Sequence, residues 1–400
     1  METEKRLEKL LDITDGSICP NCLGRKFSDI LPGPGNVKRA ESLIETFKLK
    51  KSTVECKICK GILEDLEKTA DYVEEKIKKL NLEFSTILVG SRLPENLLSA
   101  DEKINEILNI EVESIKKEIN RELGKILKKR FNCGVDFENP DIVVKVDFRK
   151  SKPRVWIQIN PLFIEGRYRK LVRGIPQTKW PCRECKGRGC PRCNFTGKMY
   201  PTSVEELVAE PALKATQGSR SKFHGAGRED VDVRMLGRGR PFVLEIKEPK
   251  IRKINLKKIS DEINKSAKGK IQVLDLKFSN RNRKVEIKTS SSYKIYKAKV
   301  KLKDKIEPSA LEKLKSLNLI KQRTPKRVAH RRADKIRKRR VIDIRWNIID
   351  SRTFEVILKT EGGLYIKELI SGDDGRTKPS VSEILNTSAE CIELDVLEVG

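Results

Sequence analysis

The spacing of apolar residues changes along the chain, and each spacing predicts a different kind of element. Up to about residue 80 the apolar side chains recur at helical spacing, first in Leu7, Leu10 and Leu11 and again across residues 62–77. Beyond that point apolar and polar positions alternate over short runs. The pattern predicts strands at 84–90, 141–148 and 154–159, with helices between residues 100 and 131. This order of elements indicates an α/β domain.

From residue 204 onward the pattern is mostly that of strands. The predicted strands are 231–236, 242–246, 271–278, 293–302, 341–349, 354–359 and 391–399, and the predicted helices are 204–209, 251–265, 308–317 and 381–385. Few helices occur as regular crossovers between these strands, so we predict a mixed sheet in an α+β domain.

Composition divides the chain further. Residues 176–203 are short of apolar positions and rich in Gly, Pro, Arg, Lys and Cys, which is typical of a small module held by a metal. We therefore predict a multidomain α+β protein with four parts. These are an N-terminal helical metal-binding region (1–80), an α/β domain (81–175), a cysteine module (176–203) and a mixed-sheet domain (204–400).

Charge changes the picture of what the chain binds. It carries 86 Lys and Arg against 58 Asp and Glu, a net charge of +28 and a pI of about 9.7. Such a field attracts polyanions, so nucleic acid is the expected partner. Apolar runs of the ~20 residues that span a membrane are lacking, and the N-terminus is polar and acidic. We expect a cytoplasmic monomer that does not interact with membranes.

Eight of the ten cysteines form four Cys-x-x-Cys pairs, which is a metal-ligand spacing. Two quartets follow: Cys19, Cys22, Cys56 and Cys59, and then Cys182, Cys185, Cys190 and Cys193. Four thiolates leave no open coordination position, so we predict two structural zinc sites and no catalytic cofactor. An iron-sulfur cluster remains an alternative at each quartet. Cys133 and Cys391 are expected to be small apolar residues rather than ligands.

The candidate for covalent chemistry is Asp230, in the sequence GREDVDVR (227–234). The carboxylate follows a flexible glycine and lies between arginines, an arrangement that supplies an anionic nucleophile without a metal. An isolated Arg-Glu-Asp triplet is more often an ordinary strand start with solvated charges. Asp232 shares a face with Asp230 if the strand begins here, and it is the rival nucleophile.

Three downstream motifs strengthen the assignment to Asp230. They are KIYKAKV (294–300), GLYIKEL (363–369) and GDDGRTKP (372–379), and together with residues 227–242 they resemble pseudouridine synthases, in particular the archaeal-type enzyme that modifies the TΨC arm of tRNA. The resemblance implies Asp230 as catalytic residue, Tyr296 against the uracil ring and Lys367 paired with Asp230. Several related families carry arginine at the position of Lys367. It also implies a THUMP domain at 81–175 that binds the acceptor end, and uridines 54 and 55 of tRNA as substrates.

The residues expected to bind substrate are basic or aromatic and lie in or near these motifs: Arg228, Tyr365, Arg331, Arg332 and Arg376. The basic segment, residues 323–340, has ten Lys or Arg and one acid, Asp334, and we expect it to contact phosphates. Its His330 is expected to stack or hydrogen-bond rather than transfer protons. Two other functions remain open: a noncatalytic tRNA-binding or chaperone protein, and a THUMP-type tRNA methyltransferase.

Overall fold

The computed structural model describes residues 2–33, 35–50, 54–150, 152–289 and 292–400. The chain forms two compact units, Met1–Pro161 with Glu248–Arg252, and Leu162–Lys247 with Lys253–Gly400. We refer to them as unit 1 and unit 2. Both combine helices with sheets, and unit 2 contains a sheet with antiparallel and parallel pairs, so the predicted α+β class is confirmed.

Unit 1 combines helices with a small sheet. Its elements are α1 (Glu2–Thr14), α2 (Pro20–Arg25), α3 (Asn36–Thr46), α4 (Leu66–Leu80), β1 (Thr86–Arg92), α5 (Glu95–Leu108), α6 (Ile115–Phe131), β2 (Gly134–Val135), β3 (Ile142–Asp147) and β4 (Arg154–Ile159). The sheet order is β2-β1-β3-β4, with β1 parallel to both of its neighbours and β4 antiparallel to β3. One apolar cluster extends from Leu7 to Val155, so the N-terminal helices and the sheet share a core.

Charged side chains also join the parts of unit 1 internally. Arg25 and Lys26 are fully buried and pair with Asp101 of α5 at 2.8 and 2.6 Å, and Arg25 also pairs with Glu118 of α6 at 2.7 Å. Buried charges are tolerated only when paired in this way. The segment that carries Cys19 and Cys22 is therefore fixed to the helices of the α/β part.

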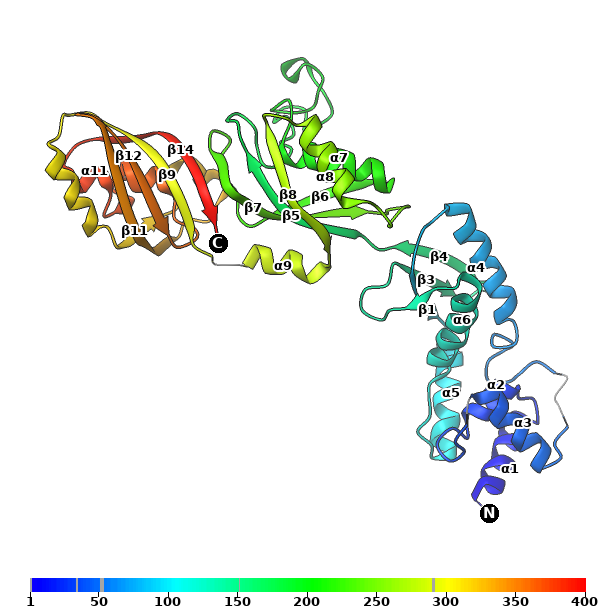
Figure 1. Ribbon diagram of the computed structural model, residues 1–400. Coiled ribbons are helices and arrows are strands. Elements are labelled where there is room, and N and C mark those ends of the chain that lie inside the picture. Colours follow the sequence, from blue (N-terminus) through cyan, green and yellow to red (C-terminus); the bar gives the residue numbers. More distant parts are fainter. Residues whose placement is uncertain (1, 34, 51–53, 151, 290–291) are drawn as a thin grey trace. The chain divides into compact units, whose positions relative to one another are not determined.

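Unit 2 is built on one large sheet (Figure 1). Its strands are β5 (Leu162–Lys170), β6 (Arg220–Gly225), β7 (Arg234–Lys247), β8 (Ile271–Ser279), β9 (Lys294–Leu302), β10 (Leu319–Arg323), β11 (Ile336–Asp350), β12 (Thr353–Thr360), β13 (Thr377–Lys378) and β14 (Ala389–Val399). Among the described residues the sheet has ten strands in the order β13-β10-β11-β12-β9-β14-β7-β5-β8, with β6 paired to β7. β5 belongs to this sheet, although the sequence analysis places residues 162–170 with the preceding domain.

Helices cover both faces of the β5–β7–β8 part. The helices of unit 2 are α7 (Val204–Thr216), α8 (Leu256–Ser266), α9 (Arg281–Thr289), α10 (Ile366–Ser371) and α11 (Val381–Ile384), with 3-10 turns η1 (Pro191–Cys193), η2 (Pro308–Ser316) and η3 (Lys326–Arg331). Ile164 and Leu244 join the main core with α7 and α8, whereas their neighbours Phe163 and Val243 pack with Ile287 of α9. Because adjacent strand residues point to opposite faces, α9 covers the face opposite α7 and α8.

β7 passes through Gly237 and Gly239, where the sequence pattern predicts two separate strands. Both glycines have positive φ (+56° and +74°), and a Cβ on Gly237 would lie 1.9 Å from the carbonyl oxygen of Leu397 in β14. The two glycines therefore let the strand bend and approach its neighbour closely instead of ending it. A buried carboxylate, Asp395 of β14, accepts both Nε and Nη2 of Arg234 at 2.9 and 2.6 Å, which fixes β14 to the start of β7.

Candidate active site

The loop between β6 and β7 carries Asp230, and a buried carboxylate beside it holds the loop in place. Glu229 is buried, accepts a hydrogen bond from the Tyr168 hydroxyl at 2.9 Å and pairs with Arg240 Nε at 2.9 Å. The buried ammonium of Lys170 donates to the carbonyl oxygens of Asp230 and Val231 at 3.0 and 3.2 Å. Val231 and Asp232 lie in a turn and β7 begins only at Arg234. Asp230 and Asp232 therefore do not share a strand face as the sequence pattern suggests.

The Asp230 side chain is about a third exposed and lines a cavity of about 200 Å³. The other lining residues are Pro176, Gln177, Trp180, Arg228, Glu229, Val231, Asp232, Arg327 and Lys367. They come from the loop between β6 and β7, the cysteine module, the basic segment and α10. The structure thus brings together three of the predicted site residues, Asp230, Lys367 and Arg228.

The ion pairs in the cavity correct one expectation. Lys367 Nζ lies 2.5 Å from Asp232 Oδ2, and Asp230 Oδ2 is instead paired with Arg327 Nη1 at 2.7 Å. Burial disfavours the charge of Asp232, but Lys367, followed by Arg327, outweighs this effect and holds the Asp232 pKa below its ordinary value. The expected pair of Lys367 with Asp230 is therefore replaced by two separate pairs, and sequence reasoning did not single out Arg327.

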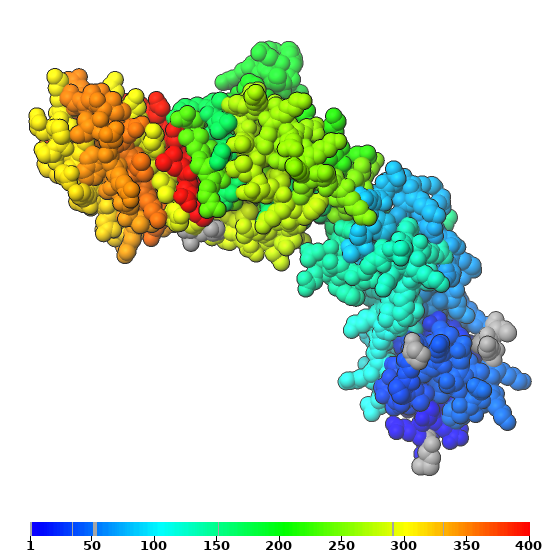
Figure 2. All heavy atoms as spheres, viewed as in Figure 1, coloured from blue at the N-terminus to red at the C-terminus, as the bar shows by residue number. Residues whose placement is uncertain are grey.

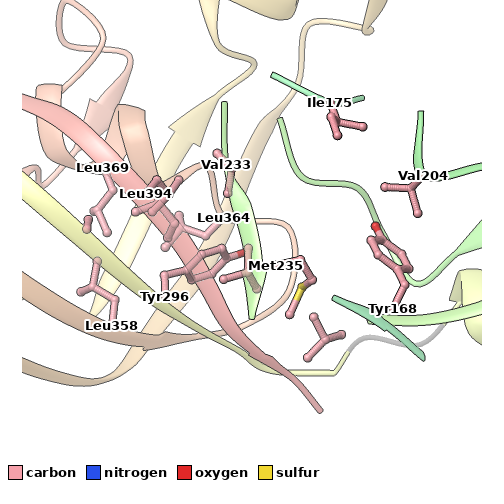
Figure 3. Packing of buried hydrophobic residues seen from close by; sticks show 14 of the residues in the cluster. Tyr168, Ile175, Val204, Val233, Met235, Tyr296, Leu358, Leu364, Leu369 and Leu394 are labelled. Atoms are coloured by element: carbon pink, nitrogen blue, oxygen red, sulfur yellow. The ribbon is translucent and has the colours of Figure 1, made fainter. Parts of the chain in front are cut away.

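Tyr296 lies in β9, within the apolar cluster that includes Leu358 and Leu364 (Figure 3). It is 9% exposed and is not among the described residues that line the cavity. Burial raises the pKa of Tyr296 to about 12; Arg240 opposes that rise and Asp230 adds to it. The phenol is therefore neutral at physiological pH. Its expected place against a uracil ring stays a prediction.

Lys294, two residues before Tyr296, is a further charged group near the loop that the sequence analysis did not single out. A Cβ on Gly227 would lie 3.0 Å from Lys294 Nζ and 3.1 Å from Arg240 Nη1, so both cations approach the loop backbone. Burial, and then Arg240, lower the pKa of Lys294 to about 8, although Glu229 opposes the shift. The Lys-x-Tyr spacing was a signal for Tyr296, and the same spacing also marked Lys294.

The other predicted substrate-binding residues lie in three places. Arg228 lies with its guanidinium carbon 6.0 Å from the centre of the Trp180 ring, and Tyr365 precedes α10 with the Arg327 guanidinium 5.8 Å from its ring. Arg376 donates to the Thr324 carbonyl oxygen at 2.7 Å and is not among the described residues that line the cavity.

In the basic segment, Asp334 pairs with Arg323 at 2.6 Å and with Arg376 at 3.2 Å. His330 and Arg332 are exposed, while the side chain of Arg331 lies outside the described part of the chain. The positive surface predicted from the sequence is thus divided. Arg327 turns toward the cavity, and other cations of the segment face solvent.

Comparison with known proteins bears on this geometry. Residues 163–400 match the family model described as Pus10, C-terminal, and residues 69–147 match the model for the archaeal Pus10 THUMP domain. A protein of Methanothermobacter marburgensis named tRNA pseudouridine synthase Pus10 is 60% identical over 100% of this chain and 99% of its own length. The protein of that name from Methanocaldococcus jannaschii is 51% identical over 90% and 79% of the two chains. The chain belongs to the Pus10 family of tRNA pseudouridine synthases.

The Pus10 assignment confirms the resemblance found in the motifs and makes the chain an isomerase. A solved Cbf5-Nop10-Gar1 complex is a more distant likeness, with 18% identity, a TM-score of 0.32 and coverage of 49% of this chain and 45% of that one. The Pus10 THUMP match lies within unit 1, and the C-terminal match begins at the second residue of unit 2.

Both cysteine quartets of this Pus10-family chain assemble as the spacing predicts. In each, the four sulfurs lie within 4.8 Å of one another. Cys19 and Cys59 Sγ are 3.7 Å apart, and in the cysteine module (residues 176–203), part of which projects in green in Figure 2, the separations are 3.7 to 3.9 Å. Four sulfurs at ~2.3 Å from one ion are separated by ~3.8 Å. The donor sets therefore fit a single tetrahedral metal ion.

Backbone amides support the second quartet further. Gly189 N–H donates to Cys185 Sγ at 3.1 Å, and Gly197 N–H donates to Cys193 Sγ at 3.3 Å. Hydrogen bonds of this kind orient thiolates and stabilise their charge. Across the described ranges no helix is long and apolar enough to cross a membrane.

Proposed function

We propose that this chain converts uridine to pseudouridine in tRNA, at the adjacent uridines 54 and 55 of the TΨC loop, with Asp230 as the nucleophile. The observation that carries the proposal is a partly exposed carboxylate, on a loop fixed by buried ion pairs, at a cavity of about 200 Å³. That volume is below the ~300 to 1,000 Å³ of clefts for drug-sized ligands and suits a single flipped base. The family membership and the motif resemblance support the substrate.

The chemistry requires no cofactor, because reactant and product are isomers. The N1–C1′ glycosidic bond of uridine breaks, the uracil rotates, and a C5–C1′ bond forms. The hydrogen on C5 leaves as a proton, and N1 ends with a proton in its place. Asp230 attacks the base or the ribose carbon, or assists departure of the uracil anion. Lys367 holds the neighbouring Asp232 ionised at the cavity wall. Tyr296, a neutral phenol in the apolar cluster of β9, is proposed to support the ring.

Binding of the rest of the tRNA offsets the few kcal/mol that base flipping costs. The exposed cations of the basic segment, including Arg332, are proposed to contact phosphates, and Arg228, Tyr365, Arg331 and Arg376 to complete the substrate surface. The THUMP domain in unit 1 is proposed to bind the acceptor end. We expect the enzyme to act as a cytoplasmic monomer.

For both quartets we propose structural zinc. In a multi-iron cluster, cysteines that bind different irons hold their sulfurs farther apart than the 4.8 Å within which all four sulfurs of each quartet lie here. The first quartet is almost completely buried, with no cysteine more than 3% exposed, so a metal there would act on folding.

Release of tritium from tRNA transcript labelled at uridine C5 tests the function directly. Asp230→Asn should abolish release while the tRNA dissociation constant stays within a few-fold, because the carboxylate acts in chemistry and adds little to phosphate binding. Asp232→Asn is the matched control in the same cavity and should retain activity. Full activity of Asp230→Asn would refute the assignment, and a reversal of the two results would move the nucleophile to Asp232.

The same assay separates the two other functions. A noncatalytic RNA-binding protein releases no tritium, and its binding is indifferent to Asp230→Asn. A methyltransferase binds S-adenosylmethionine and depends on it, whereas the proposed isomerisation proceeds with protein and tRNA alone.

A further inference from the structure

Arg327 connects the basic segment to the catalytic carboxylate. It lies in η3, whose start is held by the Lys326 N–H donating to Asp373 Oδ2 at 3.1 Å. From there its guanidinium reaches into the cavity and contacts Asp230 Oδ2 through Nη1 at 2.7 Å. Among the described side chains of residues 323–340, Arg327 is the one that lines this cavity.

A second carboxylate fixes the direction of the guanidinium. Glu368, in α10, is 4% exposed, and its two oxygens accept from Arg327 Nε at 2.5 Å and Nη2 at 3.4 Å. A buried carboxylate needs such a partner, because an unpaired buried charge is strongly unfavourable. The planar fork therefore spans two carboxylates, with Nε and Nη2 on Glu368 and Nη1 on Asp230. Tyr365 lies below the guanidinium.

We propose that Arg327 is a positioning residue for the isomerisation, and that Glu368 in turn orients Arg327. The fork holds Oδ2 of Asp230 and leaves Oδ1 to face the substrate. Since Arg327 belongs to the basic segment, contacts of that segment with the tRNA backbone and the orientation of the nucleophile are physically linked. The inference rests on the proposed role of Asp230 and adds a residue to it.

Electrostatics and geometry both favour this role over a simple phosphate contact. Burial alone would lower the Arg327 pKa, but Glu368, and then Asp230, outweigh it and raise the pKa, so the guanidinium keeps its charge in place. A lysine cannot reproduce two divergent contacts from one planar group. Arg332 is exposed and is not one of the described residues that line the cavity, so it is better placed for solvent-side phosphates.

The test compares Arg327→Gln, Arg327→Lys and Glu368→Gln by tritium release under single-turnover and steady-state conditions, and by tRNA binding across a salt series. Misplacement of a reacting group costs on the order of 10²-fold. We expect Arg327→Gln to lower kcat by roughly that factor while the tRNA dissociation constant changes by a few-fold or less. Arg327→Lys should recover part of the loss. Glu368→Gln should lower kcat less than Arg327→Gln and leave the salt dependence of binding unchanged.

Two further measurements keep the outcome decisive. Added guanidinium ion should restore turnover in Arg327→Ala but not in Asp230→Asn, and thermal unfolding of each variant shows whether the fold is intact. Arg332→Gln should give the opposite signature, with a raised KM, a flatter salt slope and an unchanged kcat.

The inference is overturned if Arg327→Gln and Arg327→Ala keep kcat and only raise KM, which would make Arg327 a phosphate contact. It is also overturned if guanidinium rescues nothing in a folded Arg327→Ala. If Asp230→Asn is inactive under the same conditions, the proposed function stands and the role of Arg327 alone fails. An active Asp230→Asn would instead refute the function.

Discussion

Removal of the Glu229 carboxylate should destabilise unit 2 strongly. Glu229→Ala leaves the guanidinium of Arg240, which is 2% exposed, and the fully buried ammonium of Lys170 without their shared anion. Breaking a buried pair from one side costs about 3 to 5 kcal/mol. For a unit the size of Leu162–Lys247 with Lys253–Gly400, each kcal/mol lowers Tm by ~2 to 4 °C, so the expected loss is roughly 6 to 20 °C.

Calorimetry at neutral pH, with circular dichroism as a second probe, measures this loss. Glu229→Gln is the closest variant, because its amide oxygen still accepts from Tyr168 and Arg240, and it should fall between Glu229→Ala and the unsubstituted chain. Glu262→Ala, on the exposed face of α8, is the surface control and should stay within about 0.5 kcal/mol. If Glu229→Ala unfolds at the same temperature as Glu262→Ala, the buried network does not hold the loop as we argue.

Three other results are expected. The purified chain should contain close to two zinc ions, and Cys56→Ser should lower thermal stability more than kcat, since metal binding there is coupled to folding; an iron-sulfur absorbance band would contradict this. Replacing Arg331, Arg332 and Lys335 by Gln should raise KM and leave kcat unchanged. The slope of log binding constant against log salt concentration should become shallower by ~0.9 for each lost duplex phosphate contact, or ~0.7 for each single-stranded contact. An unchanged slope would refute phosphate contact. The pKa of Lys294 is about 8 in the folded state and 10.5 ordinarily, so between these pH values the unfolded chain binds more protons than the folded one. This group therefore makes the free energy of unfolding rise between pH 8 and 10.5. Lys294→Met should remove that rise in denaturant titrations.

Each of these has a matched control. Cys133→Ser removes a thiol outside both quartets. Gln at Lys257, Lys258 and Lys265 removes three exposed charges of α8. For the pH series, Lys294→Arg keeps its positive charge throughout the interval, so its stability should not rise between pH 8 and 10.5, as for Lys294→Met. At pH 7, however, Lys294→Arg should retain the cost of a buried charge that Lys294→Met removes.

The sequence predicted features that depend on local spacing. The cysteine quartets follow from Cys-x-x-Cys turns, and even the first quartet, whose halves are separated by α3, was identified. The strands β3, β4, β9 and β12 also lie close to where the alternation put them. The position of Asp230 on a glycine-containing loop before a strand was readable for the same reason.

Features that depend on residues far apart in the sequence could not be predicted from the sequence. Which cation pairs with Asp230 depends on how η3 and α10 dock at the cavity, and no local rule distinguishes Arg327 from Lys367. The local sequence also predicts that the strand ends at Gly237 and Gly239, whereas pairing with β5 and β14 keeps β7 continuous. The short β10 and the highly charged α9 lack an apolar period, so their packing alone defines them.

The place of β14 in the sheet affects the order in which unit 2 can fold. β14 follows every other strand in chain order, yet it lies between β9 and β7, and its Asp395 fixes the start of the strand that the Asp230 loop enters. Without β14 the sheet would be divided into two fragments, one that ends at β9 and one that ends at β7. Closure of the sheet therefore waits for the last strand, a non-local pairing of the kind that folds slowly.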